Sequence, residues 1–562
     1  MSAARSQALD SAQADRFRQA MALLRSGAHA PALAIAETLA RQAPAAADAW
    51  QLLGMCLDGS RRQEEARQAF ERALALVPGS AVVSRNYGLF LARHGKALRE
   101  QGELEAAEPV LARAVALAPD LAFAWADLGA VRRLLGAVDG ALAAMRRAVD
   151  LQRQRGGESV DLEDAINGVL ADAGRPAEAL AGARALVARH PAHALAHETL
   201  GHLLWEHGRE LAPGEDPLDA FRAAALAQPD NRTLQLSLAR TLLTVRRPAE
   251  ALPLLQRMRQ RDPGDPLLDW FAADALDALA EYAQASTLYA SVARSALGGH
   301  PEFLNAHARH AFRTRRIELA ASCAQKAVEV EPRNQEGWSH LGTAWRLLGD
   351  VREHWLCDYD RLVGYVEIAP PRGFASLDAF LAELAPALEA LHLAGREPMR
   401  QSVRGGTQTT GLLFGRSGPP VRAAEQALRD AAERWLATLS PDPAHPFLSY
   451  RRRSVRFAGS WSVRLRSAGR HANHIHPKGW LSSAFYVSLP DSVRAPRAGS
   501  REGWIQFGEP LEELGLDLPP RRLVQPKPGH LALFPSYMWH GTVPFDDHQP
   551  RLTIAFDMQP KA

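Results

Sequence analysis

The chain is poor in cysteine and has no long hydrophobic run. Its three cysteines, Cys56, Cys323 and Cys357, stand far apart among 562 residues, so the sequence holds neither a disulfide framework nor a cysteine-based zinc cluster. No uninterrupted apolar stretch is long enough to cross a bilayer, and the N-terminus has no apolar core of the signal-peptide type. We therefore expect a protein of the reducing cytoplasm that does not insert into a membrane.

An excess of either charge is also missing. Lys and Arg together number 66 and Asp and Glu 63, which gives a net charge of +3. Such a balance offers no electrostatic argument for a nucleic-acid partner. The hydrophobic fraction of 47% and the charged fraction of 23% are typical of globular proteins, and the length is enough for several domains.

The first two thirds of the chain are rich in a periodic pattern of alanine, glycine and proline. Prolines that end helical stretches recur at intervals of roughly 34 to 36 residues or about twice that length. Within one unit, large and small residues take fixed places: Trp50, Leu53, Gly54, Leu57, Ala66, Phe70, Ala73 and Pro78. The same order returns around Trp125 and Trp338. These positions resemble the tetratricopeptide repeat, which implies an all-α solenoid of about nine to ten helix pairs over residues 12–365. Such a solenoid implies either a concave groove for a peptide or protein or a scaffold for self-association, and the repeat pattern specifies neither.

One group of histidines in this array allows two interpretations. Five histidines fall within eighteen residues: His190, His193, His197, His202 and His207. They could form a metal site, or they could be ordinary polar residues of the helix surfaces. We favour the second interpretation, because no cysteine or paired carboxylate accompanies them.

The pattern changes at a proline- and glycine-bearing linker, residues 366–374. Two amphipathic helices are expected after it, at 376–393 and 422–439, with Ser376 as the N-cap of the first. Short runs of alternating or apolar residues with glycine and proline between them follow from residue 447 onward. They predict a C-terminal β-sandwich or jelly roll over 375–562, so the chain joins an α-helical part to a β-rich part.

Three histidines dominate this C-terminal part. His474 and His476 are two residues apart, and side chains at that spacing in an extended strand project from the same face. His540 follows the run 528–535, which predicts a turn, a short apolar strand and a second break. Three such imidazoles can surround one face of a metal and leave the other face open, as non-haem iron(II) oxygenases require.

These stretches, together with 482–487, the segment 401–409 and Arg551-Leu552-Thr553, resemble the iron(II)- and 2-oxoglutarate-dependent oxygenases, in a branch related to prolyl 4-hydroxylases. The resemblance covers most of residues 395–558 and implies a double-stranded β-helix with flanking helices. It implies that His474, His476 and His540 bind Fe(II), and that the enzyme hydroxylates a C–H bond with O2 and 2-oxoglutarate. Arg551 would grip the distal carboxylate of 2-oxoglutarate with two hydrogen bonds, and Thr553 and Tyr486 would add hydroxyl donors.

His476 is a departure, because the family at large has Asp or Glu at this place. Three neutral ligands leave the metal's charge to be offset by dianionic 2-oxoglutarate. The metal is then held by all three histidines, which we favour, or by His474 and His540 alone. We expect the neighbouring His471 to stay outside the ligand set, and the basic run Arg451 to Arg453 to be a solvated edge.

Three functions follow from these observations. The first is a 2-oxoglutarate-dependent hydroxylase acting on a peptide or protein, by analogy with aspartyl/asparaginyl hydroxylases that also join repeats to an oxygenase. The second is a three-histidine dioxygenase of the cupin type that needs no 2-oxoglutarate, against which Arg551 and Thr553 argue. The third is a non-enzymatic interaction scaffold with a degenerate oxygenase domain. The sequence does not fix the substrate or the oligomeric state.

Overall fold

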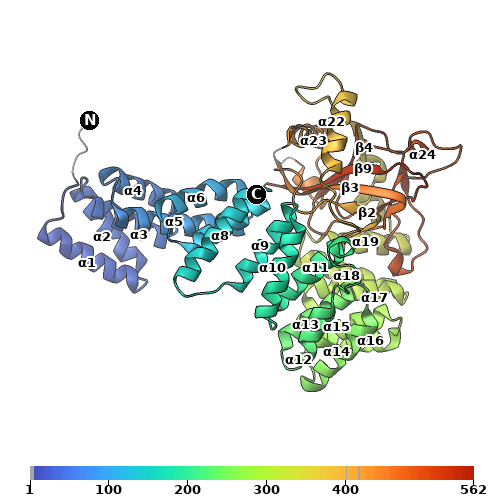
Figure 1. Cartoon of the computed structure of the whole chain (residues 1–562), viewed down its shortest axis with the longest axis horizontal. Coiled ribbons are helices and arrows are strands. Elements are labelled where there is room, and N and C mark those ends of the chain that lie inside the picture. Colours follow the sequence, from blue (N-terminus) through green and yellow to red (C-terminus); the bar gives the residue numbers. More distant parts are fainter. Residues whose placement is uncertain (1–5, 400, 416–417, 452–453, 562) are drawn as a thin grey trace. The chain divides into compact units, whose positions relative to one another are not determined.

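The computed structural model describes residues 6–399, 401–415, 418–451 and 454–561. The chain divides into two compact units, residues 1–169 and 170–562. The first unit is entirely helical in its described part, whereas the second contains further helices and all of the described strands (Figure 1). The boundary between the two units differs from the predicted domain limits at 365 and 375. Those limits and the predicted number of repeats stay predictions.

The helices of the repeat region follow one another in consecutive pairs. In the first unit they are α1 (Ser11–Arg25), α2 (His29–Gln42), α3 (Ala47–Gly59), α4 (Gln63–Leu76), α5 (Ala81–Glu100), α6 (Leu104–Leu117), α7 (Ala122–Leu134) and α8 (Val138–Gln154). Helix α9 (Val160–Asp172) spans the boundary between the units. In the second unit they are α10 (Pro176–Arg189), α11 (Ala194–Leu211), α12 (Asp219–Ala227), α13 (Arg232–Thr244), α14 (Pro248–Arg261), α15 (Pro266–Ala278), α16 (Tyr282–Ala293), η1 (Ala296–Gly299), α17 (Pro301–Arg313), α18 (Ile317–Val330), α19 (Gln335–Leu348), α20 (Arg352–Leu356) and α21 (Tyr359–Leu362).

The small residues of the repeat pattern allow two helices to approach closely. Gly54 of α3 faces the ring of Phe70 on α4, and a Cβ atom placed on Gly54 would stand 2.8 Å from the Phe70 Cδ2 atom. An alanine would therefore push the paired helices apart. The sequence pattern of a small residue opposite a large one is thus a packing requirement of the helix pair.

The tryptophans of the pattern fix the turn before their own helix. Each indole N–H donates to the carbonyl of the proline six residues earlier, from Trp50 to Pro44 (3.0 Å), Trp125 to Pro119 (3.1 Å) and Trp338 to Pro332 (2.9 Å). His197 takes the same place, with its Nε2 atom 3.1 Å from the Pro191 carbonyl oxygen. His193 caps helix α11 by accepting from the Ala196 N–H. These two histidines therefore serve the helix ends; His197 and His207 are buried, whereas we expected the group at 190–207 to lie on the helix surfaces.

The strands form two sheets that are antiparallel throughout. The larger has the order β1-β7-β4-β9-β3-β2 and the smaller the order β6-β5-β8. The strands are β1 (Gly364–Glu367), β2 (Val403–Gln408), β3 (Val455–His471), β4 (Leu481–Ser488), β5 (Ile505–Phe507), β6 (Arg522–Val524), β7 (His530–Pro535), β8 (His540–Thr542) and β9 (Arg551–Pro560). Because β1 pairs with β7, the first residues of the expected linker 366–374 belong to the sheet.

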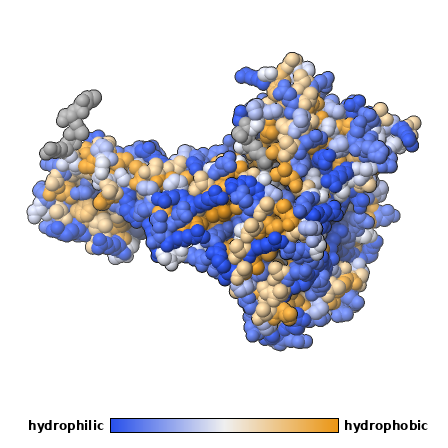
Figure 2. Space-filling model, viewed as in Figure 1, coloured by the Kyte–Doolittle hydropathy of each residue, from blue (hydrophilic) through white to orange (hydrophobic). Residues whose placement is uncertain are grey.

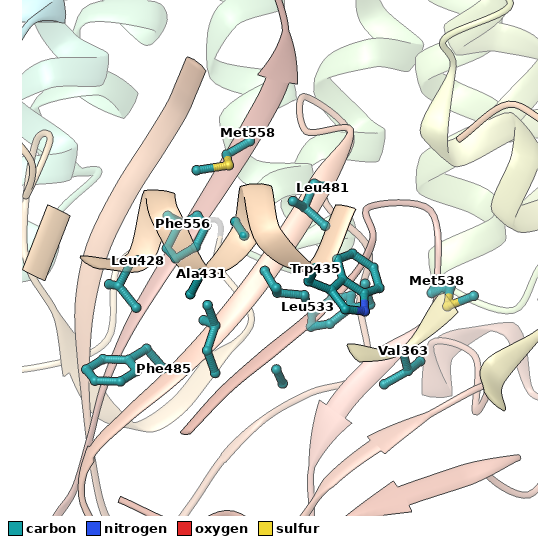
Figure 3. Packing of buried hydrophobic residues seen from close by; sticks show 14 of the residues in the cluster. Val363, Leu428, Ala431, Trp435, Leu481, Phe485, Leu533, Met538, Phe556 and Met558 are labelled. Carbon is teal, nitrogen blue, oxygen red and sulfur yellow. The ribbon is translucent and has the colours of Figure 1, made fainter. Parts of the chain in front are cut away.

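Strand β9 shows how the larger sheet separates its core from its cavity. Its even-numbered residues, including Phe556 and Met558, pack with Leu428, Ala431 and Trp435 of α23 in one buried cluster (Figure 3). Burying a side chain of this size stabilises the fold by about 1.5–3 kcal/mol. The odd-numbered residues point to the opposite face because side chains alternate along a strand, and there Arg551, Thr553, Ala555 and Asp557 line a cavity.

The expected flanking helices are present with small differences at their ends. They are α22 (Leu377–Glu389) and α23 (Pro419–Thr438), and the remaining short helices are η2 (Leu448–Tyr450), α24 (Asp491–Arg494) and η3 (Glu512–Leu514). Ser376 caps α22 as predicted, because its side chain accepts a hydrogen bond of 3.1 Å from the Ala379 N–H.

Hydrophobic residues on the surface are scattered among hydrophilic ones (Figure 2). Val82, Leu226 and Val351 are among the exposed ones, which is common on folded proteins and indicates no particular partner. In the described part of the chain, no helix combines the length and the apolar character that a membrane span needs.

Candidate metal centre and adjoining cavity

The three predicted histidines converge in the structure. The His474 and His476 Nε2 atoms lie 3.1 Å apart, and one ring nitrogen from each of His474, His476 and His540 falls within 4.8 Å of the others. Residues 472–480 form no regular strand, contrary to expectation. Instead, a single antiparallel bridge joins His474 to His540 of β8, with N–O distances of 2.9 and 3.1 Å in the two directions. This bridge brings together two segments more than sixty residues apart in the sequence.

Backbone carbonyls orient two of the rings. The His474 Nδ1 atom lies 2.8 Å from the Ala472 carbonyl oxygen, and the His540 Nδ1 atom lies 2.9 Å from that of Met538. A carbonyl only accepts, so Nδ1 carries the proton in both rings and Nε2 keeps its lone pair. This is the tautomer that metal-ligating histidines adopt.

A buried carboxylate orients the third ring. The His476 Nδ1 atom lies 2.7 Å from an Asp557 oxygen, and the same oxygen accepts a hydrogen bond of 2.7 Å from the Ser482 hydroxyl. Asp557 is only 8% exposed. The sequence analysis did not identify Asp557, although it lies six residues beyond Arg551 on the same face of β9. Following the alternation of side chains to the end of that strand would have identified Asp557.

Burial keeps the imidazoles of His474 and His540 neutral. It lowers the pKa of His474 and of His540 well below the usual value, and the neighbouring histidines lower both further. His471 lies beside the group, with its ring centre 5.7 Å from that of His474 and its Nδ1 atom 3.1 Å from the Ser402 hydroxyl. Its pKa falls to about 3, mainly through burial. His474 and His540 thus offer neutral nitrogen donors at neutral pH.

Arg551 supplies an uncompensated positive charge in the same cavity. Its side chain is almost completely buried at 2% exposure, and its Nε atom has no hydrogen-bond partner in the described structure. Its guanidinium carbon stands 5.2 Å from the ring centre of Tyr486. Burial lowers the pKa of Arg551, and the adjacent Tyr486 opposes that change. A buried cation without a counter-charge is costly, so this position is suited to an anionic ligand.

The two predicted hydroxyl donors lie around this arginine. Tyr486 and Thr553 face each other on the adjacent strands β4 and β9. The Thr553 hydroxyl is 3.5 Å from the Val463 carbonyl oxygen, and Tyr486 is fully buried beside the Arg551 guanidinium. Thr553 lines the cavity, whereas Tyr486 packs in a buried hydrophobic cluster and does not line it.

A cavity of about 900 Å³ connects these groups. The three histidines, Arg551 and Thr553 lie along it. Of the predicted basic run, Arg452 and Arg453 fall outside the described residues, and nearby Arg456 donates a hydrogen bond of 3.1 Å to the Gln559 side chain.

Family comparisons agree with this architecture. Residues 459–557 match a family described as "Putative 2OG-Fe(II) oxygenase", and residues 17–81, 93–156, 218–266 and 305–353 match the tetratricopeptide repeat family. The chain thus has tetratricopeptide repeats in its N-terminal part and a domain of this oxygenase family in its C-terminal part. The oxygenase family implies Fe(II) and 2-oxoglutarate, while the relation to prolyl 4-hydroxylases stays a prediction.

No curated protein matches the chain. Among solved structures it is similar to MamA, residue 41 to the end, from Desulfovibrio magneticus RS-1, with 20% identity, a TM-score of 0.26 and coverage of 33% of this chain and 99% of that one. It is also similar to a tetratricopeptide repeat protein from Parabacteroides merdae ATCC 43184, with 17% identity, a TM-score of 0.33 and coverage of 46% and 98%. At these scores neither likeness bears on function.

Proposed function

We propose that the C-terminal domain is an Fe(II)- and 2-oxoglutarate-dependent hydroxylase that acts on a peptide or protein recruited by the repeats. One observation carries this proposal. One ring nitrogen from each of the three histidines lies within 4.8 Å of the others, and the buried guanidinium of Arg551, which forms no ion pair with a described residue, stands in the same cavity. A site for a metal alone would not need that buried cation, which a carboxylate ligand compensates.

The donor set fits iron. Imidazole nitrogen suits Fe(II), and a metal held by these three protein ligands would have further positions for the cosubstrate and O2. When bound, Fe(II) with 2-oxoglutarate and O2 supplies the oxidising chemistry for C–H hydroxylation, with succinate and CO2 as coproducts. The chain's own residues hold the metal, fix the cosubstrate and shield the site from water.

Asp557 offers a physical explanation for the missing carboxylate ligand. The family's usual Asp or Glu would bring a negative charge to the metal directly, whereas here His476 takes that place. Because His476 donates its Nδ1 proton to Asp557, a negative charge stands immediately behind the imidazole and makes it a more basic ligand. We infer that all three histidines bind the metal and that Asp557 supplies the negative charge, on the side of the His476 ring that faces away from the metal.

Arg551 would bind the distal carboxylate of 2-oxoglutarate. Its planar guanidinium can donate two parallel hydrogen bonds, and the Thr553 and Tyr486 hydroxyls stand near enough in the sheet to assist. Hydrogen bonds to charged groups contribute about 1.5–3 kcal/mol, so removing the guanidinium should weaken cosubstrate binding by roughly 10- to 150-fold.

The test is an anaerobic Fe(II) titration with and without 2-oxoglutarate, followed by admission of O2 and measurement of succinate. His540→Ala should lose the bound iron. Arg551→Met should keep iron affinity but lose 2-oxoglutarate affinity, and Arg456→Met, a half-buried arginine on the same sheet but outside the cavity, should match the parent.

Other outcomes would favour the competing functions. Oxygen consumption that is independent of 2-oxoglutarate would indicate a three-histidine dioxygenase, and a parent chain that binds no iron would indicate a scaffold. Parental succinate formation by both the His540 and the Arg551 variants would refute the assignment of the site.

A further inference from the structure

The outer end of the cavity is built by the repeat helices. Trp205 of α11 and Thr244 of α13 line it, followed by Val245 and Arg246 in the turn after α13. The segment 396–399, which precedes β2, lies beside Trp205 and also lines the cavity. The cavity therefore runs from the histidines to a wall formed by two repeat helices within the same compact unit.

Direct contacts hold this wall in place. The Trp205 indole N–H donates to the Glu397 carbonyl at 3.0 Å, and the Gly395 N–H donates to the Glu206 carbonyl at 3.1 Å. Arg246 forms an ion pair with Glu513 of the β-rich part. Repeat residues thus form a fixed part of the passage that leads to the candidate metal centre.

The cavity has room for more than the cosubstrate. Cavities of about 300–1,000 Å³ hold ligands of drug size, and this one measures about 900 Å³. A small diacid at Arg551 fills only the inner end. The side-chain amides of Gln401 and Gln408 also line the cavity, and such amides can bond both the N–H and the carbonyl groups of a peptide backbone.

Its charged lining is predominantly basic. Among the described lining residues five are basic and two acidic: Arg246, Arg396, Arg404, Lys478 and Arg551 against Glu397 and Asp557. Arg551 belongs to the cosubstrate end, and Asp557 is bound to His476. Four basic residues and one acid are left for the rest of the passage, although the whole chain is nearly neutral.

Two of these arginines form no ion pair with a described residue. The Arg396 guanidinium lies 3.6 Å from the ring centre of Trp205, and its buried Nε atom has no hydrogen-bond partner in the described structure. Arg404 donates only to the backbone carbonyls of Gln401 and Val403. Burial lowers the pKa of Arg404 and nearby Arg246 lowers it further, whereas Glu397 and Glu513 oppose that change. Carboxylates placed in the passage would relieve this repulsion.

We propose that the passage between α11, α13 and the β-rich part takes an extended, acidic polypeptide segment and delivers one of its side chains to the metal centre. The hydroxylation of the delivered side chain rests on the proposed function, whereas the binding of the acidic segment in the passage does not. A nucleic acid would also seek basic residues, but it needs a charged track along its phosphates. Here the charges surround an inner cavity that also carries amides and the apolar side chains of Val245 and Met399.

The binding experiment uses the full chain without iron or 2-oxoglutarate. Three fluorescent peptides of equal length carry Glu, Gln or Lys at alternate positions, and their binding is measured by fluorescence polarisation, with single-stranded oligothymidine as a competitor. We expect the Glu peptide to bind at least tenfold more tightly than the Gln peptide, with an affinity that falls as salt rises.

Two variants and one matched control locate the site. Arg396→Gln and Arg404→Gln should each weaken binding of the Glu peptide by about three- to tenfold. Arg240→Gln should not, although Arg240 also stacks on an aromatic ring, that of Phe271, and sits on α13 outside the cavity. Equal binding of the Glu and Gln peptides, tighter binding of the oligonucleotide, or an equal loss in the Arg240 variant would overturn the proposal.

A second measurement separates this proposal from the proposed function. Mn(II) is added, and paramagnetic broadening of a fluorine label on the Glu peptide reports proximity to the metal. Broadening that disappears in His540→Ala supports delivery to the centre. Peptide binding without any bound Mn(II) would refute the metal site alone, and 2-oxoglutarate-dependent succinate formation without a preference for acidic peptides would refute the substrate class alone.

Discussion

The carboxylate of Asp557 provides the sharpest test of how the site is built. Asp557→Asn keeps the shape of the side chain and one oxygen acceptor but removes the negative charge behind His476. In the parent chain, one oxygen of this carboxylate accepts two hydrogen bonds of 2.7 Å, from His476 and from Ser482. The substitution therefore weakens the orientation and the basicity of one of three ligands without removing any of them.

The expected loss can be estimated. Replacing a partner that orients a metal-ligating histidine typically costs 10- to 100-fold in metal affinity, which corresponds to about 1.4–2.7 kcal/mol. Asp557 is buried and held by two donors, so we expect a value in the upper half of that range. Mn(II) binding, followed by the electron paramagnetic resonance signal of the free ion, measures it directly.

A second aspartate–histidine pair serves as the matched control. Asp277 of α15 lies 2.6 Å from the His310 Nδ1 atom and is also buried, at 3% exposure against 8% for Asp557, but it does not line the cavity. Asp277→Asn should lower the melting temperature and leave Mn(II) affinity unchanged. If Asp557→Asn bound Mn(II) within twofold of the parent, His476 would not depend on this carboxylate, and our account of the missing acidic ligand would be wrong.

Three further changes probe the surroundings of the site. Burial raises the pKa of Glu206 from 4.5 to about 7; the unfolded chain therefore ionises first, and this group lowers stability as pH rises through that window, by at most about 3 kcal/mol. Glu206→Gln should accordingly raise the melting temperature near pH 8 and not near pH 4, as calorimetry would show. Gly541→Ala places a Cβ atom against the Asn473 side chain beside β8, so it should destabilise the chain by about 1–3 kcal/mol in denaturant titrations and weaken Mn(II) binding. Trp539→Phe removes the buried hydrogen bond of 2.9 Å to Thr343 of α19 and should cost about 1–3 kcal/mol, measured in the same titrations.

Local pattern was informative wherever a residue's role depends on its near neighbours in the chain. The repeat spacing identified the tetratricopeptide repeats because Gly54 and Phe70 belong to one helix pair. The N-cap Ser376 acts within its own first turn. The alternation of Arg551 and Thr553 placed both on the cavity face of β9.

Other features were beyond the reach of such patterns. Residues 472–480 form no strand, so the convergence of His474 and His476 rests on one bridge to His540 and on Asp557, which is more than eighty residues away in the sequence. The spacing of two residues between His474 and His476 predicted that their side chains point the same way, but only through a strand that is not there. The repeat pattern did not predict that α11 and α13 form part of the cavity wall.

The sequence by itself determined the two kinds of architecture and the residues able to bind a metal and a carboxylate, because helical and strand periodicities and side-chain chemistry are local properties. Only the tertiary structure decided which nitrogen of each imidazole faces the common point, which carboxylate supports His476, and that basic residues from the repeats and the β-rich part surround one passage. Those outcomes depend on contacts between segments far apart in the chain, and the free energy of such contacts comes from packing that no single segment contains.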